Sequence, residues 1–306
     1  SAASDVYKRQ LICCGAHAQR TEVYNPHIHT VQVIANNDYM APAVIRLGEG
    51  ETVEISFDHL THDYHRYQYV LTHCNADWTP SDLSETEYLD GFNDNPIEDH
   101  DISVNTTLPY THYRLTFPND QVRPKLSGNY RLLVYDDAEG KNKPAFSTCF
   151  RILEKEVNIS AQVSSDTEID RNKNHQQVSF SIQHKGYPIR NPQNEIRVHV
   201  LQDNRTDNEV TNLQPSYVGP DQLRYEHNRA LIFPAGNEYR RFEMVSTRYA
   251  SQGVESIRYH APYYHVTLQP DLPRLLNYSY DQDQNGRFVI RYDEAVDNNL
   301  SLIHIS

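Results

Sequence analysis

Apolar and polar residues alternate with a period of two in many short runs along this chain, and no comparable run shows the 3.6-residue period of a helix. In the first clear run, Val53, Ile55 and Phe57 alternate with polar residues and therefore share one face. The same pattern recurs in residues 66–71, 112–117, 129–135, 146–153, 157–163, 178–182, 196–200, 241–245, 256–259, 264–268 and 288–292. Each run is expected to be a half-buried β-strand.

Turn-forming Pro, Asn, Asp and Gly separate these runs, a spacing typical of antiparallel sheets. The 22 tyrosines support this interpretation, because tyrosine suits strands whose rings pack while the hydroxyl reaches water. We therefore expect an all-β fold of tandem antiparallel β-sandwich domains of the immunoglobulin-like type. One helical turn is expected over residues 81–85, where Pro80 and Ser81 supply helix-starting chemistry.

The charged segment Glu154–Glu156 interrupts the alternation and predicts a domain boundary. We expect an N-terminal β-sandwich over residues 19–153, a second β-sandwich over residues 154–270, and the start of a truncated C-terminal β unit over residues 271–300. In this last segment, Asn285-Gly286 predicts a two-residue hairpin turn. The preceding Asp281 and Asp283 also match the start of a calcium loop, but Tyr292 stands where such a loop requires Glu.

Both ends carry segments that we exclude from the fold. Residues 11–18 combine a short apolar run with the small-x-small site Ala16-His17-Ala18, typical of the end of a secretory signal peptide. Residues 1–10 and 301–306 resemble translated sequencing-adapter read-through. Residues 1–18 are therefore expected to be an adapter-like artefact plus a partial signal peptide, and 301–306 an artefact-like tail. A lipoprotein attachment cysteine at Cys13 or Cys14 is the alternative.

Charge and hydropathy exclude two classes of protein. The net charge of −13 argues against nucleic-acid binding, which requires concentrated Lys and Arg. No run approaches the roughly 20 apolar residues of a membrane-spanning helix.

An exported protein enters a compartment in which disulfides persist. Cys74 and Cys149, the two cysteines beyond residue 18, therefore either form a disulfide between neighbouring strands or remain buried thiols.

No persuasive metal, cofactor or catalytic constellation is present. His59, His62 and His65 are spaced three apart, but they fall in a predicted loop, where this spacing fixes no common face. Neither a nucleophile elbow, a phosphate-binding loop nor a zinc-protease helix occurs. Acidic residues are frequent, and a glycosidase needs two of them across a cleft, a distance that a sequence does not reveal. We therefore predict no catalytic, metal-binding or cofactor-binding residues.

The stretch of residues 73–92 is too long for a simple hairpin loop and carries its own aromatic anchors. Trp78, Tyr88 and Phe92 are the candidate residues for contact with a protein partner or for stacking on a sugar. The competing interpretation is a small core that fastens the loop to the sandwich, and it is favoured slightly for Trp78.

Short sequence blocks occur in a fixed order along the chain: His73–Trp78, Glu87–Phe92, Ser103–Thr107, Tyr110–Tyr113, Phe117–Asn119, Ser127–Tyr130, His184–Ile189, Asn191-Pro192, Val200–Arg205 and Ala235–Phe242. These blocks and their order resemble the plug protein family of the type IX secretion system. The resemblance extends over roughly residues 27–298. It implies a non-enzymatic periplasmic protein that docks on an outer-membrane β-barrel translocon and closes its pore.

Two other functions are compatible with an exported, Tyr-rich β-sandwich. One is a carbohydrate-binding module that stacks glycans on Trp78 or on exposed tyrosines. The other is a β-rich hydrolase domain that uses paired carboxylates. Co-purification with an outer-membrane barrel would favour the plug. Retardation in a glycan-containing gel would favour the carbohydrate-binding module, and two carboxylates converging in a cleft would favour the hydrolase.

Overall fold

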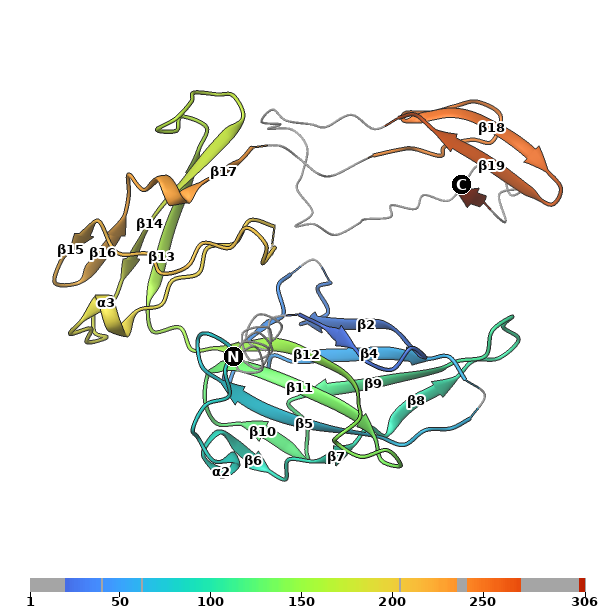
Figure 1. Cartoon of the computed structure of the whole chain (residues 1–306), viewed down its shortest axis with the longest axis horizontal. Coiled ribbons are helices and arrows are strands. Elements are labelled where there is room, and N and C mark those ends of the chain that lie inside the picture. The colour runs from blue at the N-terminus through green and yellow to red at the C-terminus, as the bar shows by residue number, and fades with distance from the viewer. Residues whose placement is uncertain are drawn as a thin grey trace, which may run out of the picture. The chain divides into compact units, whose positions relative to one another are not determined.

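A computed structural model describes residues 20–39, 41–61, 63–203, 205–235, 241–270 and the backbone of 303–305. The chain divides into two compact units, residues 1–156 and 157–306. The division lies next to the charged segment Glu154–Glu156. Strands dominate both units (Figure 1), and all but two of the strand pairs are antiparallel, so the expectation of an all-β fold is confirmed.

The first unit contains two main sheets. The larger has the order β1-β12-β11-β5-β7, with β3 added in parallel to β12, and the smaller has the order β2-β4-β9-β8. The strands of the larger sheet are β1 (Glu22–Val23), β3 (Val44–Arg46), β5 (Tyr67–Cys74), β7 (Asn95–Pro96), β11 (Gly128–Asp136) and β12 (Pro144–Leu153). Those of the smaller sheet are β2 (Ile28–Ala35), β4 (Val53–His59), β8 (Asp99–Ile102) and β9 (Thr111–Phe117).

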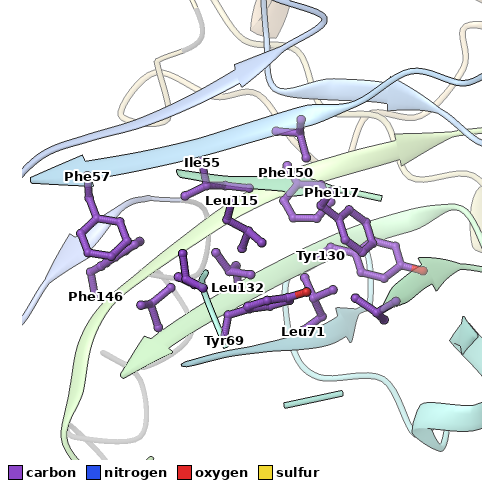
Figure 2. Packing of buried hydrophobic residues seen from close by; sticks show 14 of the residues in the cluster. Ile55, Phe57, Tyr69, Leu71, Leu115, Phe117, Tyr130, Leu132, Phe146 and Phe150 are labelled. Carbon is purple, nitrogen blue, oxygen red and sulfur yellow. The ribbon is translucent and has the colours of Figure 1, made fainter. Parts of the chain in front are cut away.

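The core of this unit lies between the two sheets (Figure 2). Phe57 of β4 illustrates the contact, because its ring centroid lies 4.9 Å from Phe146 and 5.1 Å from Tyr67, both on the opposite sheet. Leu71 and Leu132 are fully buried in the same cluster. Burying a side chain of this size contributes about 1.5–3 kcal/mol. The first unit is therefore a two-layer β-sandwich stabilised from both faces.

The strand expectations for the first unit are met at residues 52–57, 66–71, 112–117, 129–135 and 146–153. The helical turn is displaced, because α2 comprises Glu85–Tyr88 and residues 81–84 are not helical. Ser84 caps it: its backbone N–H and its hydroxyl each donate to the Glu87 carboxylate over 2.7 Å. This Ser-x-x-Glu box, and not Pro80, sets the helix start. The helix leads into β6 (Leu89–Gly91), which pairs with β10 (Val122–Pro124).

The second unit contains a smaller sheet of order β13-β14-β16-β15, with β17 also paired to β14. Its strands are β13 (Asn158–Ser164), β14 (His175–Gln183), β15 (Tyr217–Val218), β16 (Gln222–Tyr225) and β17 (Ile232–Pro234). The helix α3 (Pro192–Glu195) and the 3-10 turn η1 (Arg229–Leu231) lie in its connections. Phe180 stacks on Tyr225 at a centroid distance of 4.5 Å and forms, with Leu223, part of a small core.

Two strands expected in this unit are not formed. Residues 196–200 are irregular apart from a single bridge between Val200 and Val210, and residues 241–245 are irregular as well. Ile196, Val198 and Val200 nevertheless pack against the small core. At residues 196–200 the alternation therefore marked partial burial, but no neighbouring strand completes a ladder there. At residues 241–245 it did not, because Phe242 and Val245 are 41% and 62% exposed.

A hairpin of β18 (Val254–His260) and β19 (Tyr263–Leu268) follows, with β20 (Ile303–Ile305) paired to β19. The expected strand at residues 288–292 and the expected Asn285-Gly286 hairpin lie outside the described residues. In the part of the chain that is described, no helix is long and apolar enough to span a membrane.

Candidate partner-binding surface

The three aromatic residues predicted to contact a partner differ in exposure. Trp78 is 3% exposed and Tyr88 is 5% exposed, whereas Phe92 is 85% exposed. Tyr88 belongs to the core between the sheets, and its hydroxyl donates to the Leu71 carbonyl over 3.1 Å. The three side chains do not form one exposed platform, and of the three only Phe92 presents its ring to solvent.

Trp78 fastens a tight turn to the larger sheet. Its backbone N–H donates to the Asn75 carbonyl over 3.0 Å, and the Asn75 N–H donates to the Thr79 carbonyl over 2.8 Å. Its φ of +65° is the left-handed region that a bulky residue rarely adopts. The Arg151 guanidinium lies 5.1 Å from the Trp78 ring centroid, a cation–π distance. The small-core interpretation of Trp78 therefore holds, and sugar stacking on this buried ring is not available.

Of the two alternatives for Cys74 and Cys149, the structure contains free thiols. Cys74 lies on β5 and Cys149 on β12, and both strands pair with β11, which runs between them. Strands that are two apart in a sheet are separated by roughly 10 Å, beyond the roughly 7 Å limit between bridged Cα atoms. Burial raises the pKa of the Cys149 thiol to about 11. The two residues are inert thiols on non-adjacent strands.

Three of the many acidic residues illustrate that the carboxylates of the first unit are held by basic side chains. Asp58 lies 2.6 Å from His112, Asp94 lies 2.8 Å from Lys141 and Asp99 lies 3.1 Å from Arg114. Each carboxylate therefore has a local structural role, and none of these contacts joins two carboxylates.

Histidines gather at the end of the sandwich where β4 finishes. The ring of His59 lies with its centroid 4.3 Å from His65 and 6.0 Å from His27. Burial, followed by the charges of His65 and His27, lowers the pKa of His59 from 6.5 to about 4. His65 pairs with Asp136 through Nδ1 at 2.5 Å. His59 is therefore a neutral core imidazole at neutral pH.

This cluster does not provide a metal site in the described residues. No group of three His, Cys, Asp or Glu side chains there could hold a metal ion, and His62 lies outside them. His29, which pairs across the strands with Asp58, is exposed. The histidine spacing that drew attention in the sequence serves packing at this end of the sandwich.

A second exposed apolar feature was missed by sequence reasoning. The connection between β8 and β9 projects from one end of the sandwich (Figure 1). Ile102 at the end of β8, together with Val104 and Leu108 in the connection, is exposed, at 64%, 77% and 66% respectively. We call these three residues the hairpin tip. The sequence signal is the alternation of Ile102 and Val104 with polar residues.

Hydrogen bonds hold the backbone of the hairpin tip in shape. The Ser103 N–H donates to the Tyr110 carbonyl and the Tyr110 N–H donates to the Ser103 hydroxyl oxygen, both over 2.9 Å. The Thr106 hydroxyl donates to the Leu108 carbonyl over 2.8 Å. A preformed apolar surface of this kind loses little conformational entropy on binding. The hairpin tip and Phe92 are the most exposed large hydrophobic residues in the described part of the first unit, and we take them as its candidate contacts for a partner.

Comparison with known proteins identifies the sandwich. Residues 28–154 match the model of the type 9 secretion system plug protein 1st domain. The crystal structure of a hypothetical protein from Parabacteroides merdae ATCC 43184 is 46% identical, with a TM-score of 0.78, over 94% of this chain and 74% of that chain.

Other comparisons add little. Pseudomonas fluorescens alkylpurine DNA glycosylase AlkC bound to DNA is 11% identical, with a TM-score of 0.23, over 47% of this chain and 35% of that chain, a likeness too weak to support an argument. No match was found among curated proteins. The family match and the similar crystal structure agree with the sandwich that the strands build. The chain belongs to the type 9 secretion system plug protein family, with residues 28–154 as its first domain.

Proposed function

We propose that this protein is a non-enzymatic periplasmic plug that binds the outer-membrane β-barrel translocon of the type 9 secretion system and closes its pore. The observation that carries this proposal is the match of residues 28–154 to the plug protein first domain. Those residues include every strand of the two main sheets except the two-residue strand β1. The matched segment therefore contains both layers of the sandwich.

The physical properties of the first unit suit a stopper. A wide pore leaks solutes unless the body that fills it keeps its shape, and close-packed protein interiors have low compressibility. Phe57, Phe117 and Tyr130 are fully buried between the two sheets. A sandwich packed in this way resists deformation and occludes by its volume alone.

The contact surface of the plug would include the hairpin tip. Exposed aliphatic residues on an ordered loop are the type of anchor that fills a partner's pocket, and the fully desolvated centre of an interface carries most of its energy. The tip lies next to charged strands, since Asp99 and Asp101 of β8 both pair with Arg114. The arrangement is an apolar anchor with a polar rim.

Co-purification tests the proposal. The chain carrying an affinity tag is expected to retain an outer-membrane barrel from detergent-solubilised envelopes, and deletion of the gene is expected to increase uptake of a dye that intact outer membranes exclude. Absence of the barrel from the eluate together with unchanged dye uptake would contradict the proposal. Retardation of the protein in a glycan-containing gel would instead favour the carbohydrate-binding module.

Substitutions in the hairpin tip test whether it contacts the barrel. The triple variant Ile102→Ser, Val104→Ser, Leu108→Ser is expected to weaken retention of the barrel by about tenfold or more, because each buried aliphatic anchor contributes about 1 kcal/mol or more. Ile169→Ser is the matched control, since Ile169 is 52% exposed on the second unit. Equal retention by both variants would exclude the tip as a contact.

A further inference from the structure

Strand β13 lies at the edge of the sheet in the second unit. Among the described residues it pairs only with β14, through an uninterrupted register from Asn158 opposite Gln183 to Ser164 opposite Gln177. Its seven residues therefore present a continuous row of backbone groups on the other side. Such a row is a template for another strand, and proteins usually protect it.

The other edge strands in the described part of the chain carry that protection. Some are only two or three residues long, and β7, β10 and β17 also contain proline. β8 carries Asp99 and Asp101, while β2 and β18 have register shifts that interrupt the ladder. These are the known devices against unwanted strand pairing.

β13 has none of these devices. Its sequence Asn-Ile-Ser-Ala-Gln-Val-Ser contains no charge and no proline, and its ladder has no bulge. Ile159 and Val163 share a face and are 66% and 59% exposed. An unprotected edge with an exposed apolar row is a surface that remains to be covered.

We propose that this edge is covered by β13 of a second copy of the chain, in an antiparallel pair whose two-fold axis passes at Ala161. In that register Ile159 faces Val163 of the second copy, Ser160 faces Gln162, and Asn158 faces Ser164. Apolar residues meet apolar residues and polar residues meet polar residues along all seven positions. The two sheets become one continuous sheet with a joined apolar row.

The self-complementary pattern of β13 is the reason for choosing a second copy as the occupant, and its lack of charge makes the contact possible. Two copies of a chain with a net charge of −13 repel each other, so self-association needs a contact strip without acidic residues. β13 is an uncharged strip, and its pattern reads the same in both directions. Residues directly opposite each other contribute favourably when both are apolar and unfavourably when they carry like charges.

The two-fold axis provides the test, because residue 161 meets itself. Wild-type protein is expected to sediment at twice the mass of the 35.5 kDa chain. Ala161→Lys and Ala161→Glu are each expected to raise the dimer dissociation constant by about tenfold or more, through like charges placed directly opposite. An equimolar mixture of the two variants is expected to recover the dimer, since Lys then faces Glu.

Folding and specificity have separate controls. Circular dichroism establishes that both variants fold, and Gln183→Lys, on the paired strand β14, is expected to leave the dimer unchanged. If the charged variants unfold, Ala161→Cys replaces them and is expected to cross-link on oxidation, whereas Thr267→Cys on β19 is not.

Three results would overturn the pairing. They are a monomeric wild-type protein at micromolar concentration, a dimer insensitive to folded charged variants, and a mixture of folded variants that stays monomeric. Failure of the cysteine variant at position 161 to cross-link would overturn it as well.

Discussion

The two units use the same alternating pattern but bury it to different degrees. In the first unit, Ile55 alternates with polar neighbours and is 1% exposed, because a second sheet covers its face. In the second unit, Ile159 alternates in the same way and is 66% exposed. The alternation specifies which face is apolar, and a second layer determines whether that face is removed from water.

The covering layers explain the difference. The first unit places ordered strands such as β4 and β9 over β5 and β11. In the second unit, the irregular residues Val198, Val200 and Val210 pack on part of the sheet. They lie against the small core and leave the apolar face of β13 exposed. A regular sheet covers a neighbouring sheet along its length, whereas irregular segments cover it only locally.

The largest expected loss of stability comes from creating a cavity between the two sheets of the first unit. Ile55→Ala is expected to reduce the free energy of unfolding of the first unit by about 2–5 kcal/mol, because it removes buried methyl groups and leaves a void. Urea denaturation followed by circular dichroism measures the loss. A change below about 1 kcal/mol would mean that the two sheets do not enclose Ile55 as closely as its burial indicates.

The stability of the first unit is expected to depend on pH through His59. The unfolded chain protonates His59 near pH 6.5 and the folded chain only near pH 4. Protons are therefore bound more strongly by the unfolded chain, and stability is expected to fall as the pH drops from about 6.5 to about 4, by up to about 3 kcal/mol.

Substitution isolates this contribution. His59→Gln is expected to flatten the acid limb of the stability profile in that pH range, while His29→Gln, at an exposed position, is expected to leave it in place. Denaturant midpoints measured at several pH values provide the comparison. Identical acid limbs in wild type and His59→Gln would assign the pH dependence to other groups.

The smallest expected effect on stability is at Ile159, the residue of the second unit that was compared with Ile55. Ile159→Ala is expected to change the unfolding free energy of the monomer by no more than about 0.5–1 kcal/mol, because most of the side chain is already in water. The measurement is made at protein concentrations below self-association. A loss equal to that of Ile55→Ala would show that β13 is covered within a single chain.

Most of the fold could be predicted from the sequence. Val53, Ile55 and Phe57 were assigned to one face, and all three are at most 1% exposed. The alternation of side chains between two faces is a property of the extended backbone, so it can be recognised in the sequence without knowing which strands pair. The run at residues 196–200 shows the limit, since its valines are packed but no strand forms.

The candidate surface was less predictable. An aromatic residue in a long loop has the same sequence signature whether it is buried, like Trp78, or exposed, like Phe92. The hairpin tip drew no attention because Ile102 and Val104 alternate like strand residues. Exposure depends on which segments pass over a residue, and those segments are distant in the sequence.

The sequence alone therefore determined the all-β class, the strands β4, β5, β9, β11 and β12 of the first unit and the resemblance to a secretion plug, because each rests on local spacing or on short ordered blocks. Only the tertiary structure decided that Trp78 and Tyr88 are buried, that Cys74 and Cys149 are kept apart by β11, and that β13 has a free edge among the described residues. The physical reason is that burial and strand pairing are relations between distant segments, which a local pattern constrains but does not specify.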